Sequence, residues 1–336
     1  MNVRKLASVQ RVLALHPIPT ADAIELAQIN GWQCVVKKGE FQIGDLGVYF
    51  EIDAVPPDRP MFDFLWKGQA KRPGSLRIRT VRLRGALSQG LLMPLGLFTE
   101  AEGTQEGADL TGALGVYKYE PPPPDGMGDY RGPFPALVVK TDEMRIQSFP
   151  QLIDELRGKP YVCTLKCDGT SATFCMWEGE FHVCGRNHSI SDADNIFWRV
   201  ARRYNLPEIM AQYPDLALQG EVVGPGIQKN RLGLKAVDFR AFNLYDMRNG
   251  RSLDHAECFA FYEKHGIPAA PVIEEGQDFQ HTVESLLQIA EGLYPDTNNE
   301  MEGIVIRPLV GQFSQNLAGR LSFKAINNRF LLKGGD

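Results

Sequence analysis

Residues 161–169 read Tyr-Val-Cys-Thr-Leu-Lys-Cys-Asp-Gly, an apolar segment that ends in a lysine, a carboxylate and a glycine. The apolar segment predicts a buried strand, whose side chains alternate between two faces. One face carries Thr164, Lys166 and Asp168, and the other carries Cys163, Leu165 and Cys167. A lysine beside a carboxylate can bind a phosphate and a metal, and a lysine in an apolar site can lose its proton and act as a nucleophile. The alternative is a surface lysine that ends a strand before a turn.

The length and charge of the chain limit what it can be. Its 336 residues are many for a single core, so two domains are expected. No apolar run approaches the ~20 residues that span a bilayer, and the N-terminus has no secretory apolar core, so no membrane partner is expected. The net charge of −5 argues against a protein that coats nucleic acid by bulk charge, but it allows a local basic groove.

The six cysteines show no C-x-x-C pair and no regular framework. Four of them lie in apolar segments near Lys166, where cysteine usually packs as a small hydrophobe. This usage favours a reducing compartment, the cytoplasm, over a disulfide scaffold or a zinc site.

A proline- and glycine-rich stretch divides the chain. Residues 121–124 are all proline, and residues 125–135 contain three glycines and two more prolines. Such a stretch predicts a semi-rigid linker. We therefore expect an OB-like domain over residues 1–120, a linker over 121–136 and a second domain over 137–336.

The first of these parts has short alternating segments separated by turn signals, which predicts a small antiparallel β-barrel. Its one dense basic cluster lies in residues 76–84. Arg77 and Arg79 share one face of a predicted strand, and Arg82 and Arg84 share the other. These arginines suit the phosphates of a bound strand, whereas the alternative is a solvated edge strand.

The second part mixes strand and helix signals, which favours an α+β domain with antiparallel sheets. The predicted strands are 161–165, 172–177, 180–184, 216–223, 239–245, 303–307 and 321–324. The predicted helices are 149–156, 195–204, 256–265 and 282–293, the third capped by Asp254.

Several predicted strands end in charged or polar side chains: Arg186 and Asn187, Glu221, Glu302 with Arg307, and Lys324. Charges at such positions are costly unless they are paired or bound to an ion. Carboxylates that bind Mg²⁺ and cations that bind phosphates suit a nucleoside triphosphate. No P-loop and no Rossmann fingerprint is present, so the common phosphate-binding folds are not expected.

These segments, in order, resemble the motif series of the covalent nucleotidyltransferases, which comprise the polynucleotide ligases and the mRNA capping enzymes. The series consists of Lys166-x-Asp168-Gly169, Gly185-Arg186-Asn187, Gly220-Glu221, residues 242–246, residues 302–307 and Ser322-Phe323-Lys324. Residues 38–50 and 83–90 resemble the N-terminal OB-fold domain of the Naegleria/Deinococcus-type RNA ligases. The resemblance implies an OB-like barrel followed by an adenylyltransferase domain with ATP-grasp-like antiparallel sheets and helices.

The resemblance also implies roles for the charged residues. Lys166 is the expected nucleophile toward the α-phosphorus of ATP, which would leave a lysyl-AMP. Asp168, Glu221 and Glu302 are expected to hold Mg²⁺ or Mn²⁺, and Lys324 to bind the α-phosphate. The expected nucleotide contacts are Thr164, Gly169, Arg186, Asn187, Tyr245, Phe242 and Arg145. Of the two rings, Tyr245 is expected to stack on adenine, with Phe242 as the alternative.

One position departs from the family pattern, because many relatives have a lysine where this chain has Ser322. The hydroxyl shares a strand face with Lys324 but supplies no second positive charge. The chain also ends soon after Lys324, where DNA ligases and capping enzymes continue into a further domain, so an RNA ligase is the favoured reading.

The expected reaction is ATP-dependent sealing of 3′-OH and 5′-phosphate RNA ends, with a nicked duplex as the expected substrate and RNA/DNA hybrids as a further one. The expected role is RNA repair by a cytoplasmic monomer. The alternatives are a DNA ligase, a GTP-using capping-type enzyme, and a non-catalytic nucleic-acid-binding protein.

Overall fold

The computed structural model describes residues 4–19, 21–66, 76–120 and 128–333. The chain forms two compact units. The first comprises Met1–Pro121 together with Ile146–Pro150 and Leu331–Asp336, and the second comprises Pro122–Arg145 and Gln151–Phe330. No helix in the described part of the chain is long and apolar enough to cross a membrane.

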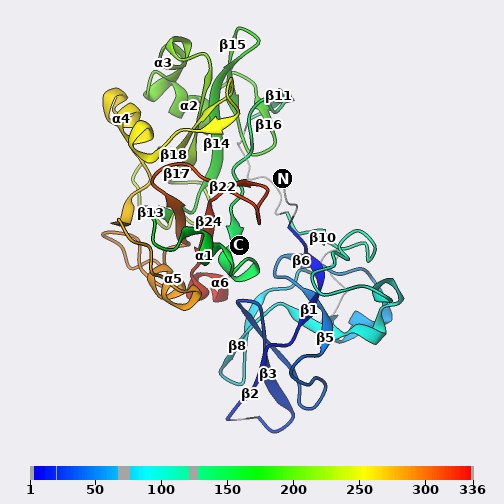
Figure 1. The fold of residues 1–336 in the computed structure, drawn as a ribbon. Helices are drawn as coiled ribbons and strands as arrows, with labels where there is room; N and C mark the ends of the chain where they lie inside the picture. The colour runs from blue at the N-terminus through cyan, green and yellow to red at the C-terminus, as the bar shows by residue number, and fades with distance from the viewer. Residues whose placement is uncertain (1–3, 20, 67–75, 121–127, 334–336) are drawn as a thin grey trace. The chain divides into compact units, whose positions relative to one another are not determined.

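The first unit consists of short antiparallel strands (Figure 1). One sheet has the order β1-β5-β9, from Ala7–Arg11, Leu46–Phe50 and Leu91–Pro94. A second has the order β2-β3-β4, from Ala14–Pro17, Ile24–Ile29 and Trp32–Lys37. Two pairs complete the set: β7 (Thr80–Leu83) with β8 (Ala86–Gln89), and β6 (Ala54–Val55) with β10 (Tyr117–Lys118). The aromatic rings of Phe50, Phe62 and Phe98 pack together in its core.

The basic cluster of this unit is divided by burial. The side chain of Arg77 is only 8% exposed, pairs with Asp53 at 3.6 Å and lies over the ring of Tyr119. Arg79, Arg82 and Arg84 are exposed on or beside the β7–β8 hairpin. The prediction that all four arginines face a bound strand is therefore wrong for Arg77, whose charge is used inside the fold.

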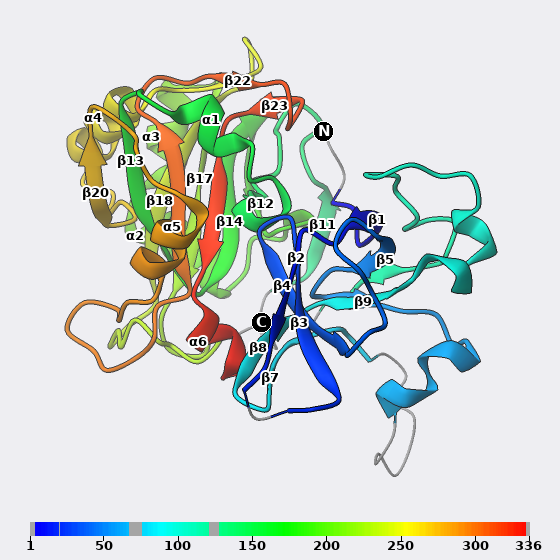
Figure 2. The ribbon, with the colours of Figure 1, turned by 60° about the horizontal axis from the view of Figure 1, so that its bottom comes forward.

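The described part of the second unit contains two large sheets and one two-stranded sheet. The seven-stranded sheet has the order β11-β16-β15-β14-β17-β18-β19 and is antiparallel throughout. Its strands are Tyr130–Pro133, His188–Ile190, Glu180–Cys184, Thr170–Trp177, Leu216–Val223, Asp238–Asp246 and Arg251–Ser252. The five-stranded sheet has the order β12-β24-β21-β13-β20, with strands Met144–Arg145, Phe323–Ile326, Gly303–Pro308, Tyr161–Lys166 and Val272–Gly276. Figure 2 shows β20 at the edge beside β13. A short hairpin joins β22 (Phe313–Ser314) to β23 (Gly319–Arg320).

Helices cover the outer face of the seven-stranded sheet. Buried side chains of α2 (Ile196–Arg203), α3 (Leu206–Gln212) and α4 (His255–His265) form one core with strands β14, β17 and β18. Asn195 caps α2 by accepting hydrogen bonds from two backbone N–H groups, and Asp254 is the N-cap of α4, as predicted. Helix α5 (Val283–Ala290) lies against β21 and β24, and α1 (Leu152–Leu156) and α6 (Asn328–Leu332) are single short turns.

The structure confirms the predicted α+β class and every predicted strand of the second unit. The bounds of β15 and β17 are those predicted, and the others differ by up to two residues. The predicted linker is partly wrong. Residues 121–127 lie outside the described part of the chain, but Tyr130–Pro133 forms β11 and pairs with β16. Proline is tolerated there because it stands at the last position of an edge strand.

Candidate active site

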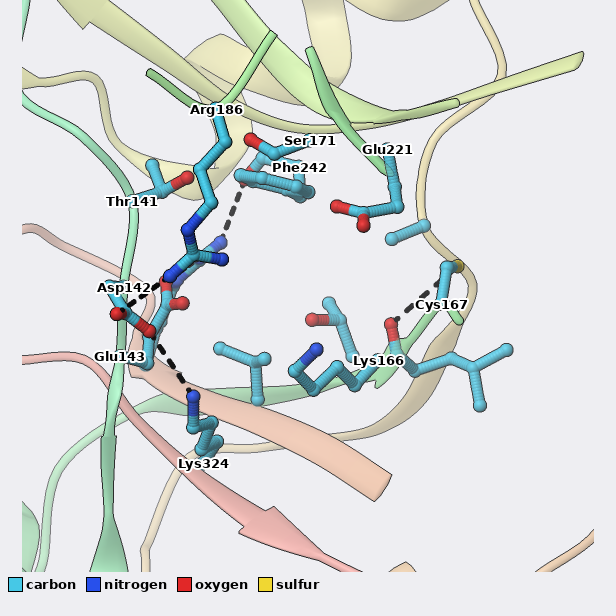
Figure 3. Close-up of a pocket in the computed structure, with 15 residues that line it drawn as sticks. Thr141, Asp142, Glu143, Lys166, Cys167, Ser171, Arg186, Glu221, Phe242 and Lys324 are labelled. Carbon is cyan, nitrogen blue, oxygen red and sulfur yellow. Dashed lines mark hydrogen bonds and ion pairs between the residues drawn. The ribbon is translucent and has the colours of Figure 1, made fainter. Parts of the chain in front are cut away.

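A pocket of the second unit is lined by residues of both sheets. Residues 164–167 come from β13 and the turn after it, Val305 and Arg307 from β21, and Lys324 from β24. The seven-stranded sheet contributes Ser171, Glu221 and Phe242, and Arg186 follows β15. Residues 141–143 close one side. Figure 3 shows Lys166 and Lys324 on one wall, with Glu221 and Phe242 across from them.

Lys166 ends β13 and faces a carboxylate of the neighbouring strand. Its Nζ lies 2.6 Å from Glu302 Oε1, and the two side chains are 24% and 12% exposed. Antiparallel pairing of Lys166 with Gly303 places Glu302 just beyond the last pair of the ladder. Burial lowers the pKa of Lys166, but the charges of Glu302 and Glu221 outweigh it, so the net pKa lies above the ordinary value. The ammonium is therefore held charged by its carboxylate partners.

Glu221 lies on β17, in the wall opposite Lys166. Burial and, after it, the charge of the nearby Glu302 raise the pKa of Glu221 to about 8, and the charge of Lys166 offsets only part of these effects. A buried carboxylate with a raised pKa next to a second carboxylate is a place where a bound cation is favourable.

The opposite end of the pocket carries cations. Lys324 Nζ lies 3.4 Å from Asp142 Oδ1, and an Arg186 Nη lies 2.9 Å from the other oxygen of the same carboxylate. Burial lowers the pKa of Lys324, and the charges of Lys166 and Arg145 lower it further against the opposing charge of Asp142. The exposed Asp142 thus pairs with both Lys324 and Arg186, which are cations of the kind that bind phosphates.

The aromatic wall of the pocket is Phe242 rather than Tyr245. On β18 the register shifts between the pairs Gln219–Asn243 and Gly220–Ala241, which leaves Phe242 as the extra residue of a β-bulge. A bulge redirects a side chain, and Phe242 lines the pocket. Tyr245 pairs with Ala217, four residues before Glu221, and packs with Val138 and Met247 in a separate cluster.

Asp168 is not among the residues that line the pocket. Strand β13 ends at Lys166, so the predicted alternation does not extend to Asp168. Its carboxylate instead lies 3.4 Å from the guanidinium of Arg231, which stacks over the ring of Phe330. Leu165 and Cys167 also line the pocket, although alternation assigned them to the opposite face. Both are buried, as predicted for packing residues.

Gly169 is required by the close approach of two strands. A Cβ at this position would lie 2.4 Å from the carbonyl oxygen of Val222 and 2.7 Å from Glu221 Cγ. The glycine therefore allows β17 to bring Glu221 next to the turn that follows the lysine.

The remaining predicted residues are distributed around the site. Thr164 is buried and lines the pocket. Arg145 is buried on β12, where it pairs with Lys324 in the parallel ladder, but it does not line the pocket. Asn187 is exposed and accepts a hydrogen bond from Lys140 at 3.0 Å.

The sequence analysis did not identify a buried hydrogen-bond network next to Lys324. Arg307 donates to Glu143 Oε1 at 2.6 Å, to the carbonyl of Phe242 at 2.7 Å and to Ser322 Oγ at 3.0 Å. Burial raises the pKa of Glu143, but the charge of Arg307 outweighs it, and the net pKa lies below the ordinary value. The hydroxyl of Ser322 therefore belongs to an internal network. The arginine at the end of a predicted strand was the only sequence signal for it.

The donor set fits a divalent cation that is shared with a bound molecule. Within residues 4–19, 21–66, 76–120 and 128–333, no three His, Cys, Asp or Glu side chains are grouped to hold a metal by themselves. Glu221 and Glu302 provide two carboxylates on either side of Lys166. Mg²⁺ and Mn²⁺ commonly take one or two carboxylates and complete their shell with phosphate oxygens and water.

Comparisons with known proteins agree with this geometry. A family model described as an OB-fold domain matches residues 6–95, and one described as RNA ligase matches residues 159–326. No curated protein sequence matches the chain.

Solved structures of Naegleria gruberi RNA ligase resemble the whole chain. A lysine-to-alanine mutant with ATP and Mn is 36% identical, with a TM-score of 0.91 over 98% of this chain and 99% of that one. The structure with PPi is 36% identical, with a TM-score of 0.90 over 98% and 99%. An aspartate-to-alanine mutant without ligand is 37% identical, with a TM-score of 0.91 over 99% of each chain. The chain belongs to the RNA ligase family.

Proposed function

We propose that this protein is an ATP-dependent RNA ligase that joins 3′-OH and 5′-phosphate RNA ends through a lysyl-AMP on Lys166. The observation that carries the proposal is the position of Lys166. It ends a buried strand in contact with Glu302 and opens into a pocket that also holds Glu221, Lys324, Arg186 and Phe242. The relatives with ATP, AMP and PPi bound support the same nucleotide for this pocket.

The proposed reaction has three steps. Nζ of Lys166 loses a proton and attacks the α-phosphorus of ATP, and pyrophosphate leaves with the electrons of the broken P–O bond. An oxygen of the RNA 5′-phosphate then attacks the same phosphorus, and the lysine leaves and regains its proton. Finally the RNA 3′-hydroxyl loses its proton to solvent, its oxygen attacks the activated 5′-phosphorus, and AMP leaves with the electrons of the broken P–O bond.

Each residue of the site has a part in this scheme. Glu302 orients Lys166, and loss of the ammonium proton requires that the charge of Glu302 be offset. Lys324 and Arg186 suit the negative phosphates, and Phe242 suits the adenine ring because bases stack on aromatic side chains. Arg145 and Asn187, which do not line the pocket, are proposed to act on the outer phosphates and the RNA end. Tyr245 does not line the pocket, so Phe242 takes its place as the proposed stacking residue.

We propose Glu221 and Glu302 as the residues that hold Mg²⁺ or Mn²⁺, with Asp168 in a positioning role because it pairs with Arg231. The metal supplies positive charge next to the α-phosphate and the two carboxylates. Thr164 and Gly169 complete the lysine side of the nucleotide site.

The substrate that we propose is a nicked RNA duplex, with the OB-like domain of residues 1–120 in contact with the nucleic acid through Arg79, Arg82 and Arg84. We propose residues 1–120 and 137–336 as the two functional domains. We further propose an RNA-repair role for a monomer in the cytoplasm, where the six buried, free thiols of this chain would stay reduced.

The test is detection of a covalent protein-AMP on a denaturing gel after incubation with labelled ATP and Mg²⁺ or Mn²⁺. Wild-type protein should form the adduct, Lys166→Ala should form none, and Glu302→Ala should lose most of it. Sealing of a nicked RNA duplex, a nicked DNA duplex and single-stranded RNA follows as the substrate test. An adduct that survives Lys166→Ala would refute the proposed nucleophile, and an adduct with GTP instead of ATP would refute the proposed nucleotide.

A further inference from the structure

A single buried hydroxyl holds the two strand ends that carry Lys166 and Glu302. Tyr294 is 1% exposed and lies in the segment between α5 and β21. Its hydroxyl donates to the carbonyl of Lys166 at 3.0 Å. It also accepts from the backbone N–H of Asp168 at 2.9 Å and from that of Glu302 at 3.2 Å. A tyrosine hydroxyl has one donor and two acceptor sites, so these three bonds use its full capacity.

The location of this hydroxyl gives it a specific task. The ladder between β13 and β21 ends at the pair Lys166–Gly303, so the backbone groups beyond it have no partner in the sheet. Buried backbone groups must be paired, and the tyrosine hydroxyl takes the place of the missing rung. The carbonyl of Glu302 is bonded separately by the N–H of Asn327 at 2.9 Å. The backbone of Glu302 is thereby fixed on both sides.

Tyr294 is itself held by the loop in which it lies. Its N–H donates to the carbonyl of Asn299 at 2.9 Å, and its carbonyl accepts from Thr297 Oγ1 at 2.9 Å. A bridge between Leu293 and Glu300 closes the same loop. The hydroxyl therefore has a defined position, as a positioning group needs.

We infer that Tyr294 is a positioning residue for lysine adenylylation. Tyr294 does not line the pocket, and it acts by fixing the backbones that aim Lys166 and Glu302 at the α-phosphorus. The inference rests on the proposed function. It assigns a role to a residue that lies outside the nucleotidyltransferase motif series.

The closing experiment compares Tyr294→Phe with Tyr161→Phe in single-turnover formation of protein-AMP across a range of ATP concentrations. Tyr161 lies on the same strand as Lys166, is also buried, and its hydroxyl bonds Glu274 and His281 at the far end. Tyr294→Phe should lower the rate at saturating ATP about ten- to a hundredfold, because a misplacement of about 1 Å can cost a hundredfold. The KM for ATP should stay within about threefold, since the binding contacts are intact. Tyr161→Phe should leave both values near wild type.

A second assay separates positioning from general damage. RNA with a pre-adenylylated 5′ end is sealed without attack by Lys166, so Tyr294→Phe should lose less activity there than in adduct formation. Equal loss in both assays, or a KM change without a rate change, would overturn the inference. If Tyr294→Phe does not fold, Thr297→Val removes the side-chain bond to the carbonyl of Tyr294 while the backbone N–H of residue 297 still donates to it, and this variant should give a smaller effect of the same kind. An unchanged rate in that variant would then overturn the inference.

A failure of the proposed function has a different signature. Wild-type protein would then form no adduct with ATP and would not seal pre-adenylylated RNA. In contrast, failure of the positioning role leaves wild-type activity intact and shows only in the variant, as a rate that matches wild type, an equal loss in both assays or a change in KM alone.

Discussion

At the scale of single residues, the site depends on side chains placed where regular structure ends. Lys166 is the last residue of β13, Glu302 immediately precedes β21, and Phe242 occupies a bulge of β18. Charged and aromatic groups at such positions can point into a pocket while their neighbours stay in the sheet. Substitutions at these points should therefore separate local chemistry from the stability of the sheets.

Replacing Gly169 with alanine should damage the lysine side of the pocket. The new Cβ would lie 2.4 Å from the carbonyl oxygen of Val222, which is backbone and cannot move cheaply. We expect a loss of about 1–3 kcal/mol in the free energy of unfolding, as for other overpacked sites, together with slower adduct formation. Urea denaturation and the protein-AMP assay measure the two effects. Gly132→Ala is the matched control, because nothing lies within 4 Å of a Cβ there.

Restoring the lysine that many relatives have at position 322 should not improve this enzyme. Ser322 is 7% exposed and bonded to Arg307 and Glu143, so Ser322→Lys places a second buried cation beside that arginine. We expect lower stability by about 1–3 kcal/mol and no faster adduct formation. Ser322→Ala, which adds no charge and no volume, is the comparison. A faster and equally stable Ser322→Lys protein would contradict the assignment of Ser322 to the internal network.

At the scale of elements, connections between a helix and a sheet are stabilised by ion pairs that titrate. Asp238 begins β18, accepts a hydrogen bond from Tyr204 at the end of α2, and pairs with Arg240 at 2.7 Å. Burial raises the pKa of Asp238, but these two partners outweigh it, and the net pKa is lowered. A carboxylate with a lowered folded pKa contributes stability above its unfolded pKa of about 3.9, and that contribution is lost as the pH falls through the folded value.

Tyr204→Phe should therefore destabilise the protein in a pH-dependent way. Near neutral pH the variant should be less stable by about 1.5 kcal/mol, since a hydrogen bond to a charged group is lost. The difference from wild type should shrink as the pH falls below about 3.9 and through the lower folded pKa of Asp238, because the wild-type carboxylate then becomes protonated. Urea denaturation of both proteins at several pH values tests this. A constant difference at all pH values would show that Asp238 is not the group involved.

Most elements of the second unit could be predicted because long apolar runs have a strong period. The strands β15 and β17 had the right bounds, and α4 had the right cap at Asp254. The three-residue β16 and the helix α3 were missed. Strand β16 is too short to show a period. Helix α3 follows Asn205, whose positive φ of 53° separates α3 from α2, so the two helices do not share one continuous helical period.

At the scale of the whole molecule, the two compact units have separable tasks in the proposed reaction. The pocket that holds Lys166 is built within the second unit, whereas the exposed arginines of the β7–β8 hairpin lie in the first. Adduct formation and RNA binding should respond to different substitutions for this reason.

Charge reversal of Arg79 and Arg82 should weaken sealing more than adduct formation. Both side chains are exposed in the first unit, and each phosphate contact that is lost should reduce the slope of log affinity against log salt by about 1. RNA binding at several salt concentrations, sealing rate and protein-AMP yield are the measurements. Arg248→Glu, at an exposed site of the second unit, is the control. Equal loss of sealing and adduct would show that the hairpin acts on ATP or on folding.

The sequence alone was enough to predict the class of fold, the order of the motifs and part of the pocket, including Lys166, Glu221 and Lys324. Lys166, Glu221, Glu302 and Lys324 stand out because a charge inside an apolar run is costly without a partner. The folded structure was needed to show that Phe242 rather than Tyr245 lines the pocket. A β-bulge at Phe242 breaks the two-residue alternation of strand side chains on which the sequence prediction relied.

The tertiary structure also decided how the strand ends are held. Arg307 with Glu143, and Tyr294 with the backbone of Lys166, join residues 164 and 128 positions apart. Glu143 and Tyr294 belong to no local sequence pattern that would identify them as partners of these residues. The physical reason is that buried backbone N–H and C=O groups at a strand end need a hydrogen-bond partner, and that partner can come from a segment that is distant in sequence but close in the fold.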